Sequence, residues 1–156
     1  ARQAIGTSFI NTQGGEGINK VLACAPSIKE RSQLMPEQIA DDYSEQWSKA
    51  ETNWQCAAIF GHQPVTKRTV KPAGEWNHFT VTCKGQKIWI VLNGELVNEC
   101  DMSLFTSATV NPDGTKIPSW LKNPMATLPL HGHIGLQGKH AGAPIYFRNI
   151  MIKELN

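Results

Sequence analysis

The sequence has no apolar run that approaches the roughly 18 residues of a membrane-spanning helix. It also has little net charge, because 15 basic and 13 acidic residues leave only +2. A balance this weak gives no reason to expect nucleic acid or an anionic membrane as a partner. A chain that is 40% hydrophobic and contains five tryptophans is expected to fold rather than to be disordered. The 156 residues fit one domain, residues 1–156, with a core of its own.

Several catalytic and metal-binding motifs are absent as well. The four cysteines, Cys24, Cys56, Cys83 and Cys100, form no C-x-x-C pair, which argues against a zinc ribbon or a thioredoxin site. No G-x-S-x-G elbow indicates a serine hydrolase, and the glycine-rich residues 14–17 lack the lysine of a phosphate-binding loop. The even cysteine count is compatible with one or two disulfides, although four buried thiols fit it equally. The even cysteine count, together with a first residue that is not methionine, leads us to expect an extracytoplasmic location, periplasmic or secreted.

The clearest structural pattern lies between residues 77 and 101. Residues 78–84, 87–92 and 95–101 are predicted strands, joined by turns at Gly85-Gln86 and Asn93-Gly94. Asn-Gly is the strongest signal for a two-residue hairpin, because both turn residues need a positive φ. We therefore expect an antiparallel meander of three strands.

The two turns predict which side chains share a face of this meander. If Leu92 pairs with Glu95 and Ile90 with Val97, the core face carries Phe79, Val81, Cys83, Ile88, Ile90, Leu92 and Val97. The other face carries His78, Thr80, Thr82, Trp89, Val91, Leu96, Asn98 and Cys100. A disulfide needs Cα atoms within about 7 Å. A Cys83–Cys100 disulfide is therefore disfavoured, since the two lie on opposite faces of non-adjacent strands.

The rest of the chain is less regular. Residues 18–25, 55–62, 130–136 and 145–155 are further predicted strands. Residues 36–50 are predicted to form a helix, because Pro36 suits a first turn and Ile39, Tyr43 and Trp47 recur every four residues. Residues 103–129 contain four prolines and form a long excursion, in which Trp120 is expected to hold the loop against the body.

Four short motifs follow one another in a set order. They are G-E-W-N at residues 74–77, L-N-G at 92–94, G-H-I-G-L-Q at 132–137 and F-R-N-I at 147–150. With A-A-I-F-G-H-Q-P at 57–64, they resemble the 3-keto-disaccharide hydrolase family over about residues 55–156. The resemblance implies an all-β fold, a concanavalin-A-like jelly-roll β-sandwich, here with one helix in the N-terminal half. Residues before 54 match less well, so this half is either rebuilt around the helix or lacks strands that another segment supplies.

A saccharide site in such a sandwich needs aromatic rings for the apolar faces of pyranoses and polar groups for their hydroxyls. Trp89, flanked by Thr80, Thr82 and Asn98, is the predicted platform. Trp76 is instead expected to be a core anchor, because it opens a strand after a glycine-bearing turn. The resemblance gives Arg148 a structural role or a place at the rim of the site. The alternative for Trp89 is that it packs beneath a loop such as residues 103–129.

Catalytic groups are harder to assign. His131 and His133 alternate along a predicted strand and so share a face. With His140 or His62 they could serve acid–base chemistry or hold a divalent metal, the one cofactor considered, although a polar sheet face explains them as well. Glu75 is a further catalytic candidate, but no two carboxylates share a face as a glycosidase requires.

Three functions follow from these residues and the resemblance. The first is an enzyme, of glycoside hydrolase or keto-sugar lyase type, that acts on glycans or small saccharides through the concave sheet. The second is a non-catalytic module that binds glycans on the same face. The third is a structural subunit of a larger extracytoplasmic assembly, whose fold a protein partner completes.

Overall fold

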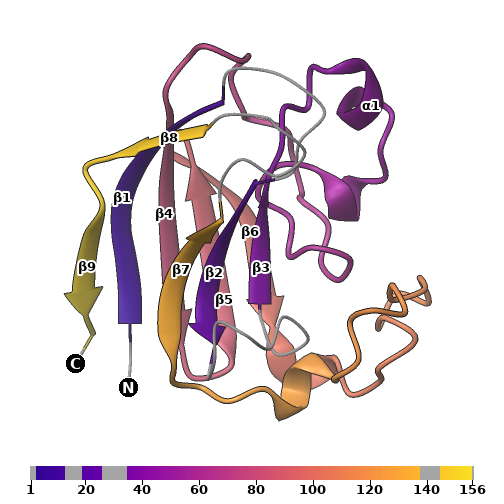
Figure 1. The fold of residues 1–156 in the computed structure, drawn as a ribbon. Helices are drawn as coiled ribbons and strands as arrows, with labels where there is room; N and C mark the ends of the chain where they lie inside the picture. The colour runs from indigo at the N-terminus through magenta and orange to yellow at the C-terminus, as the bar shows by residue number, and fades with distance from the viewer. Residues whose placement is uncertain (1–2, 13–18, 26–34, 138–144, 156) are drawn as a thin grey trace.

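The computed structural model describes residues 3–12, 19–25, 35–137 and 145–155, with side chains from Ile39 onward except those of His133 and Gln137 (Figure 1). The strands of these residues form two antiparallel sheets. Sheet A has the order β6-β5-β4-β1-β8, with β9 also paired to β1, and sheet B has the order β3-β2-β7. The strands are β1 (Gln3–Thr12), β2 (Asn19–Ala25), β3 (Met35–Ile39), β4 (Asn77–Lys84), β5 (Lys87–Leu92), β6 (Glu95–Asp101), β7 (His133–Gln137), β8 (Ile145–Arg148) and β9 (Met151–Glu154).

The predicted meander is present as β4, β5 and β6. Both turns set the expected register beside them, with Cys83 opposite Ile88 and Leu92 opposite Glu95. Asn93 and Gly94 both have positive φ, 53° and 86°, as the two-residue hairpin turn requires. The Asn93 side chain adds to the turn, because its Oδ1 accepts a hydrogen bond from the His78 backbone N–H at 2.9 Å.

One part of the predicted register is wrong. A bulge between β5 and β6 places Ile90 opposite Asn98 rather than Val97. Val97 and Asn98 are therefore both buried, and Cys100 turns inward with them. The Asn98 amide stabilises the bulge, because its Nδ2 donates to backbone carbonyl groups at 3.2–3.3 Å; the acceptors belong to Ala57, Gln63 and Pro64. The period-two pattern of the strand carries no sign of this contact.

The cysteines whose side chains the structure describes, Cys56, Cys83 and Cys100, are buried, and no disulfide joins any two of them. The reason expected to disfavour a Cys83–Cys100 disulfide is wrong in part, because the two cysteines do not lie on opposite faces of the meander. Cys83 of β4 and Cys100 of β6 pair with Ile88 of β5 from opposite sides. Both side chains therefore lie on the core face of sheet A, as that of Ile88 does. Burial raises the pKa of the Cys100 thiol to about 12, and burial likewise raises the pKa of the Cys56 thiol.

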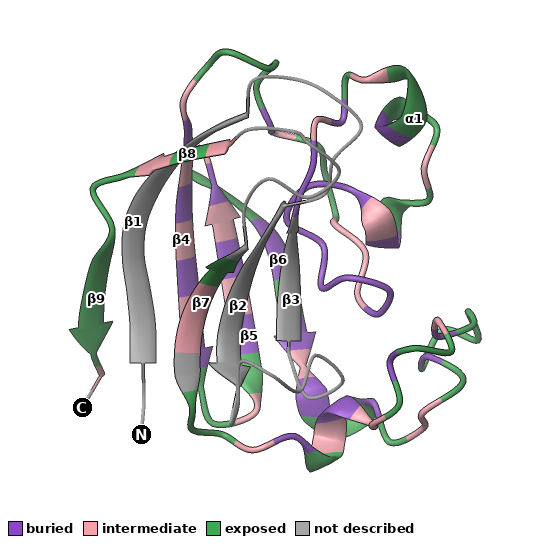
Figure 2. Ribbon diagram, viewed as in Figure 1, coloured by how far each residue is buried: buried purple, intermediate pink, exposed green. Residues whose placement is uncertain are grey.

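The core lies on one face of sheet A. Strand β4 alternates between buried and half-buried residues along most of its length, and β5 does the same (Figure 2). The predicted core set is buried throughout, and Ile39 of β3 and Ile134 of β7 pack against it from sheet B. The all-β prediction is therefore confirmed, with two sheets that share one core. The finer jelly-roll topology stays a prediction.

The helix predicted over residues 36–50 is wrong in extent. Residues Met35–Ile39 form β3, which pairs with β2, and the helix α1 covers only Glu45–Ser48. The Ser44 hydroxyl starts this helix by accepting a hydrogen bond from the Trp47 backbone N–H at 3.3 Å. Ile39 and Trp47 are buried as the periodicity indicates, whereas Tyr43 is exposed. Apolar spacing alone cannot separate a strand followed by a short helix from one longer helix.

The strand predicted over residues 55–62 is also wrong. This segment is a series of turns with one isolated bridge between Ile59 and Gln63. Ala57 and Gly61 both have a φ of 71°, which an extended strand does not allow. The segment is nonetheless wholly buried. Its continuous apolar character, without amphipathic alternation, explains why the sequence indicates a core strand there.

The C-terminal prediction is correct in type but not in continuity. Residues 145–155 divide into β8 and β9, because Asn149 has a φ of 54° and turns the chain. Both strands pair with β1, β8 along its second half and β9 along its first. In Figure 1, β8 crosses the top of sheet A before β9 descends along its edge.

Residues 103–129 form the expected excursion, which contains the 3-10 turn η4 (Met125–Thr127) and begins within η3 (Met102–Leu104). Phe105, Met125 and Leu128 bury their side chains in the main core. Trp120 stays 48% exposed, with its ring centroid 5.2 Å from that of Phe60. Within the described residues, no helix is long and apolar enough to cross a membrane.

Candidate functional site

The side of sheet A that faces away from the core carries a row of half-buried polar and aromatic residues. On β4, Thr80 and Thr82 alternate with the buried core residues, and on β5, Val91 and Trp89 lie directly opposite them. The bulge in β6 brings Glu99 opposite Trp89, on the same side. Alternation along each strand thus collects a ring, two hydroxyls and a carboxylate on one surface.

The same surface continues across β1 to β8. Phe147 of β8 and Asn77 of β4 both pair with Ile10, and both face the core. Their neighbours in the chain, Tyr146, Arg148 and Trp76, therefore lie on the outward side. A direct contact agrees with this placement, because the guanidinium carbon of Arg148 lies 3.9 Å from the centroid of the Trp76 ring.

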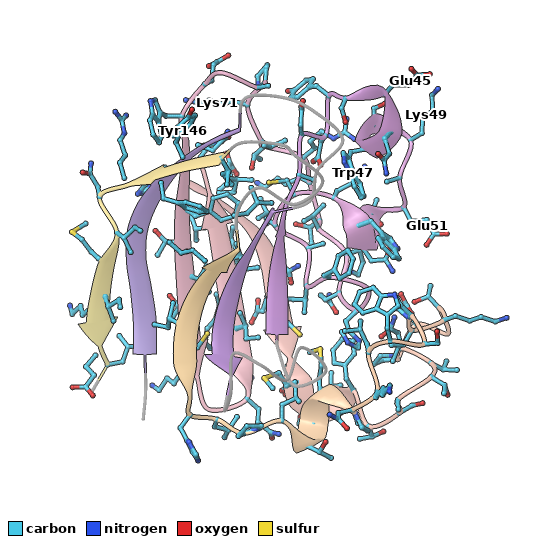
Figure 3. All side chains as sticks on the ribbon, in the orientation of Figure 1. Glu45, Trp47, Lys49, Glu51, Lys71 and Tyr146 are labelled. Carbon is cyan, nitrogen blue, oxygen red and sulfur yellow. The ribbon has the colours of Figure 1, made fainter. Side chains whose placement is uncertain are left out.

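We call this surface the outer face and define it by these residues: Trp76, His78, Thr80, Thr82, Trp89, Val91, Leu96, Glu99, Tyr146 and Arg148. Six residues along the chain separate Trp76 from Thr82, which lies opposite Trp89, and this is about 20 Å at the usual rise of a strand. The outer face therefore has room for several sugar rings. Figure 3 shows Tyr146 and Lys71 at the end where β8 crosses the sheet.

The two ends of the outer face differ in charge. Arg148 gives the β8 end a guanidinium that lies over the Trp76 indole, and this contact limits its orientation. Glu99 gives the other end a carboxylate directly opposite Trp89. Thr80 and Thr82 add hydroxyl groups between them. Aromatic rings with hydroxyls and a guanidinium suit a polyhydroxylated ring that has one apolar face.

The predicted site residues divide between three places. Trp89, Thr80 and Thr82 lie together on the outer face, and Arg148 joins them there. Asn98 does not, because the bulge turns its side chain to the core, where it is 1% exposed. Glu75 is exposed in the turn just before Trp76, where its backbone N–H donates to the Pro72 carbonyl at 3.2 Å. Their roles in binding or catalysis stay predictions.

The histidine candidates lie elsewhere. His133 is the first residue of β7, which belongs to sheet B. His131 lies two residues before this strand. His131 is exposed, and His140 lies outside the described residues. His62 is buried, its Nδ1 lies 3.0 Å from Asn111 Oδ1, and burial lowers its pKa. The described residues contain no group of three or more histidine, cysteine or acidic side chains placed to hold a metal ion.

Sequence reasoning missed Trp76, Tyr146 and Glu99 as members of the outer face. The expectation that Trp76 anchors the core is wrong, because its ring lies outward against Arg148. The sequence does single out the two motifs that carry these residues. G-E-W-N and F-R-N-I are the segments that meet at this contact. The alternative that residues 103–129 cover Trp89 is not supported, because the buried side chains of that loop pack on the core side.

The chain matches the model of the 3-keto-alpha-glucoside-1,2-lyase-like domain over residues 26–153, and it belongs to this family. The match begins well before residue 55, so residues 26–54 are part of the domain as well. Comparison with curated proteins gives no match. Family membership supports a carbohydrate-related function.

Solved structures from Parabacteroides distasonis ATCC 8503 resemble this fold. One candidate glycosyl hydrolase superimposes with a TM-score of 0.94 at 42% identity and covers 98% of this chain and 78% of its own. A second, at 20% identity, has a TM-score of 0.67 over 99% of this chain and 70% of its own. The second likeness concerns the fold alone. The first also supports a relation to glycosyl hydrolases.

Proposed function

We propose that the chain is an enzyme that cleaves 3-keto-α-glucosides, with the sugar bound on the outer face of sheet A. The observation that carries the proposal is the stack of Arg148 on Trp76, on the same surface as Trp89. The family description supplies the substrate class, and the 42% identical candidate glycosyl hydrolase supports action on a glycosidic bond. The stack supplies a positive charge next to an aromatic platform.

Elimination suits these residues better than hydrolysis by two carboxylates. In a sugar that carries a ketone at C3, the C2 proton is acidic because it lies next to the carbonyl. A base removes this proton, a C1–C2 double bond forms, the bond from C1 to the glycosidic oxygen breaks, and that oxygen takes up a proton. The reaction needs one base and one group that stabilises negative charge on the C3 oxygen.

Arg148 is the proposed stabiliser of that charge. A guanidinium held in place by Trp76 can donate hydrogen bonds to an enolate oxygen without first rearranging. The proposed base is Glu75 or His78, the residues that flank Trp76 and Asn77 at this end of β4. Trp89 lies about 20 Å further along the same face and is proposed to hold a more distant sugar of an oligosaccharide.

The test is steady-state cleavage of a 3-keto-α-glucoside oligosaccharide that is long enough to span the outer face. Arg148→Ala should lower kcat by about a hundredfold or more, as expected when a stabilising donor is lost, and Arg148→Lys should recover part of it. Trp89→Ala should mainly raise KM. Trp120→Ala is the matched control, because it removes an exposed tryptophan that lies off the outer face. Unchanged kcat in Arg148→Ala would contradict the proposal.

A non-catalytic glycan-binding module is the second candidate, favoured by the absence of a carboxylate pair on the outer face among the residues described. It predicts that the wild-type protein binds the oligosaccharide without cleaving it. In that case Trp89→Ala should weaken binding, and Glu75→Gln and His78→Asn should leave it unchanged.

A further inference from the structure

The cleavage proposed for the outer face needs a proton donor as well as a base. Without a donor, the oxygen that leaves C1 would depart as an alkoxide, and a positioned acid contributes about 10²–10⁴-fold to such a step. In an α-glucoside the C2 hydrogen and the C1 oxygen are both axial, on opposite faces of the ring, and this alignment is the one in which both bonds break most easily. The base and the acid therefore approach the sugar from opposite sides, so one residue cannot serve as both.

Strand β1 separates two groups of outer-face residues at the β8 end of sheet A. His78 of β4 and Arg148 of β8 both pair with Phe9 of β1, from its two sides. Neighbouring strands lie about 4.8 Å apart, so β4 and β8 are about 10 Å apart here. The Arg148 guanidinium lies over the ring of Trp76, next to the start of β4. A sugar whose C3 oxygen the guanidinium holds therefore has residues of β4 on one side and residues of β8 on the other.

Tyr146 is the group on the β8 side that can donate the proton. It lies two residues before Arg148, so the two side chains leave the same face of β8 from Cα atoms about 7 Å apart. A phenol hydroxyl carries its proton at neutral pH and can transfer it to the more basic oxygen of an alkoxide. Tyr146 is 55% exposed, so water can restore the proton after each turnover.

The other polar residues of this region suit the task less well. Arg148 does not release its proton in proteins. Thr80 and Thr82 lie two and four residues beyond His78 on β4, and their aliphatic hydroxyls are weaker acids than a phenol. Glu75 and His78, the proposed bases, lie on the β4 side of the sugar. The acid expected on the opposite side is therefore the tyrosine of β8.

We propose that Tyr146 is the general acid of the cleavage, an inference that rests on the function proposed above. The base removes the C2 proton and leaves an enolate, whose charge Arg148 stabilises. The enolate electrons then form the C1–C2 double bond as the bond from C1 to the glycosidic oxygen breaks. The Tyr146 hydroxyl gives its proton to that oxygen, which leaves as an alcohol. The tyrosinate takes a proton from water and the base releases its own, so the protons balance.

The test compares cleavage of methyl and 4-nitrophenyl 3-keto-α-glucosides by the full chain. The two substrates share the sugar ring and differ in the leaving oxygen, because nitrophenolate departs without a proton whereas methoxide does not. Tyr146→Phe should lower kcat about a hundredfold or more for the methyl glucoside and less than about threefold for the nitrophenyl glucoside. Equal losses for the two substrates, or no loss for the methyl glucoside, would overturn the proposal.

A second measurement distinguishes a missing acid from a damaged site. In D₂O, Tyr146→Phe should still exchange the C2 hydrogen of the methyl glucoside for deuterium faster than buffer alone does, because the base and Arg148 act before the C1–O bond breaks. Loss of this exchange together with cleavage would overturn the role of Tyr146 as the acid. A wild-type chain that neither exchanges nor cleaves would overturn the proposed function itself, and this inference with it.

Two variants serve as controls. Tyr43, the other tyrosine of the chain, is also 55% exposed, but its hydroxyl donates to the Val70 carbonyl at 3.1 Å, and Tyr43→Phe should leave both rates unchanged. Lys71 is the competing donor, because Figure 3 shows it at the same end of the molecule as Tyr146. Lys71→Met should leave the ratio of the two rates unchanged. Loss of methyl glucoside cleavage in Lys71→Met, with none in Tyr146→Phe, would overturn the proposal.

Discussion

The guanidinium carbon of Arg148 lies 3.9 Å from the centroid of the Trp76 ring, and this contact joins the strand β8 to the start of β4. The two residues come from the F-R-N-I and G-E-W-N motifs, which are far apart in the sequence. A cation stacked on an exposed indole gains about 0.5–1 kcal/mol. More important for the proposed chemistry, the indole limits the directions in which the guanidinium can point.

The first prediction concerns this contact. Trp76→Leu should lower kcat for the keto-glucoside, because Arg148 loses its orientation, whereas Trp76→Phe should retain more activity because a ring remains. In an Arg148→Ala background, the same Trp76→Leu change should have a smaller effect on kcat. Additive losses in that double-mutant cycle would show that the two residues act separately.

The second prediction concerns Asp42, which is 1% exposed and follows β3 in the chain. Burial raises the pKa of its carboxyl from 3.8 to about 6, against the opposing effects of the Cys56 backbone N–H at 2.9 Å and of Arg68 at 3.7 Å. A carboxyl whose folded pKa is raised stabilises the fold fully below pH 3.8 and loses that contribution as the pH rises through 6.

Asp42→Asn removes this titration. The free energy of unfolding of the variant, relative to that of the wild type, should therefore rise between about pH 4 and pH 7 by about 2 kcal/mol, from the size of the shift. Urea unfolding at both pH values measures the difference. Glu45→Gln, which neutralises an exposed carboxylate of α1, is the control and should show no such trend. A constant difference between Asp42→Asn and wild type would contradict the buried-carboxyl account.

The third prediction concerns the β6 bulge. Asn98→Ala leaves the carbonyl groups of Ala57, Gln63 and Pro64 without the amide that donates to them. The free energy of unfolding should fall by about 1–3 kcal/mol, the cost of unsatisfied buried acceptors. Leu96→Ala, at an exposed position of the same strand, should cost far less. Equal losses in chemical denaturation would show that the amide does not anchor the bulge.

The fourth prediction concerns Gly61. A Cβ at this position would lie 2.9 Å from Pro118 Cδ and 3.1 Å from Leu121 Cδ1, in addition to the strain of a φ of 71°. Gly85 also has a positive φ, 60°, but a Cβ added there would meet no atom within 4 Å. Both alanine variants are destabilised by the positive φ, by about 1–2 kcal/mol. In Gly61→Ala, overpacking should lower the free energy of unfolding by about 1–3 kcal/mol more than in Gly85→Ala. Thermal unfolding measures both variants. A loss in Gly61→Ala no greater than that in Gly85→Ala would contradict the close contact with Pro118 and Leu121.

The meander of sheet A can be predicted from sequence, because its strands carry local signals, whereas β1 is not among the predicted strands. Alternation and the Asn93-Gly94 turn define β4, β5 and the start of β6. The bulge cannot be predicted, because it depends on Asn98 meeting carbonyl groups that lie 34 to 41 positions earlier in the chain. The overextended helix has a related cause, since the pairing of β3 with β2 decides the conformation of Ile39.

The site can be predicted only in part. Trp89, Thr80 and Thr82 share a face because the alternation of neighbouring strands fixes it locally. Trp76 and Arg148 cannot be joined to them without knowing that β1 lies between β4 and β8. The extracytoplasmic location and a protein partner that completes the fold stay predictions, since nothing in the described residues bears on either.

The central claim is that the outer face of sheet A binds the sugar, and the indole N–H signals of the five tryptophans test it most directly. The experiment is a ¹H–¹⁵N titration with a carbon-linked analogue of a 3-keto-α-glucoside oligosaccharide that spans the outer face and cannot undergo elimination. We predict shifts of the Trp76 and Trp89 signals and none of Trp47, which is buried within α1. Shifts confined to Trp54 and Trp120, or no shift at all, would contradict the account.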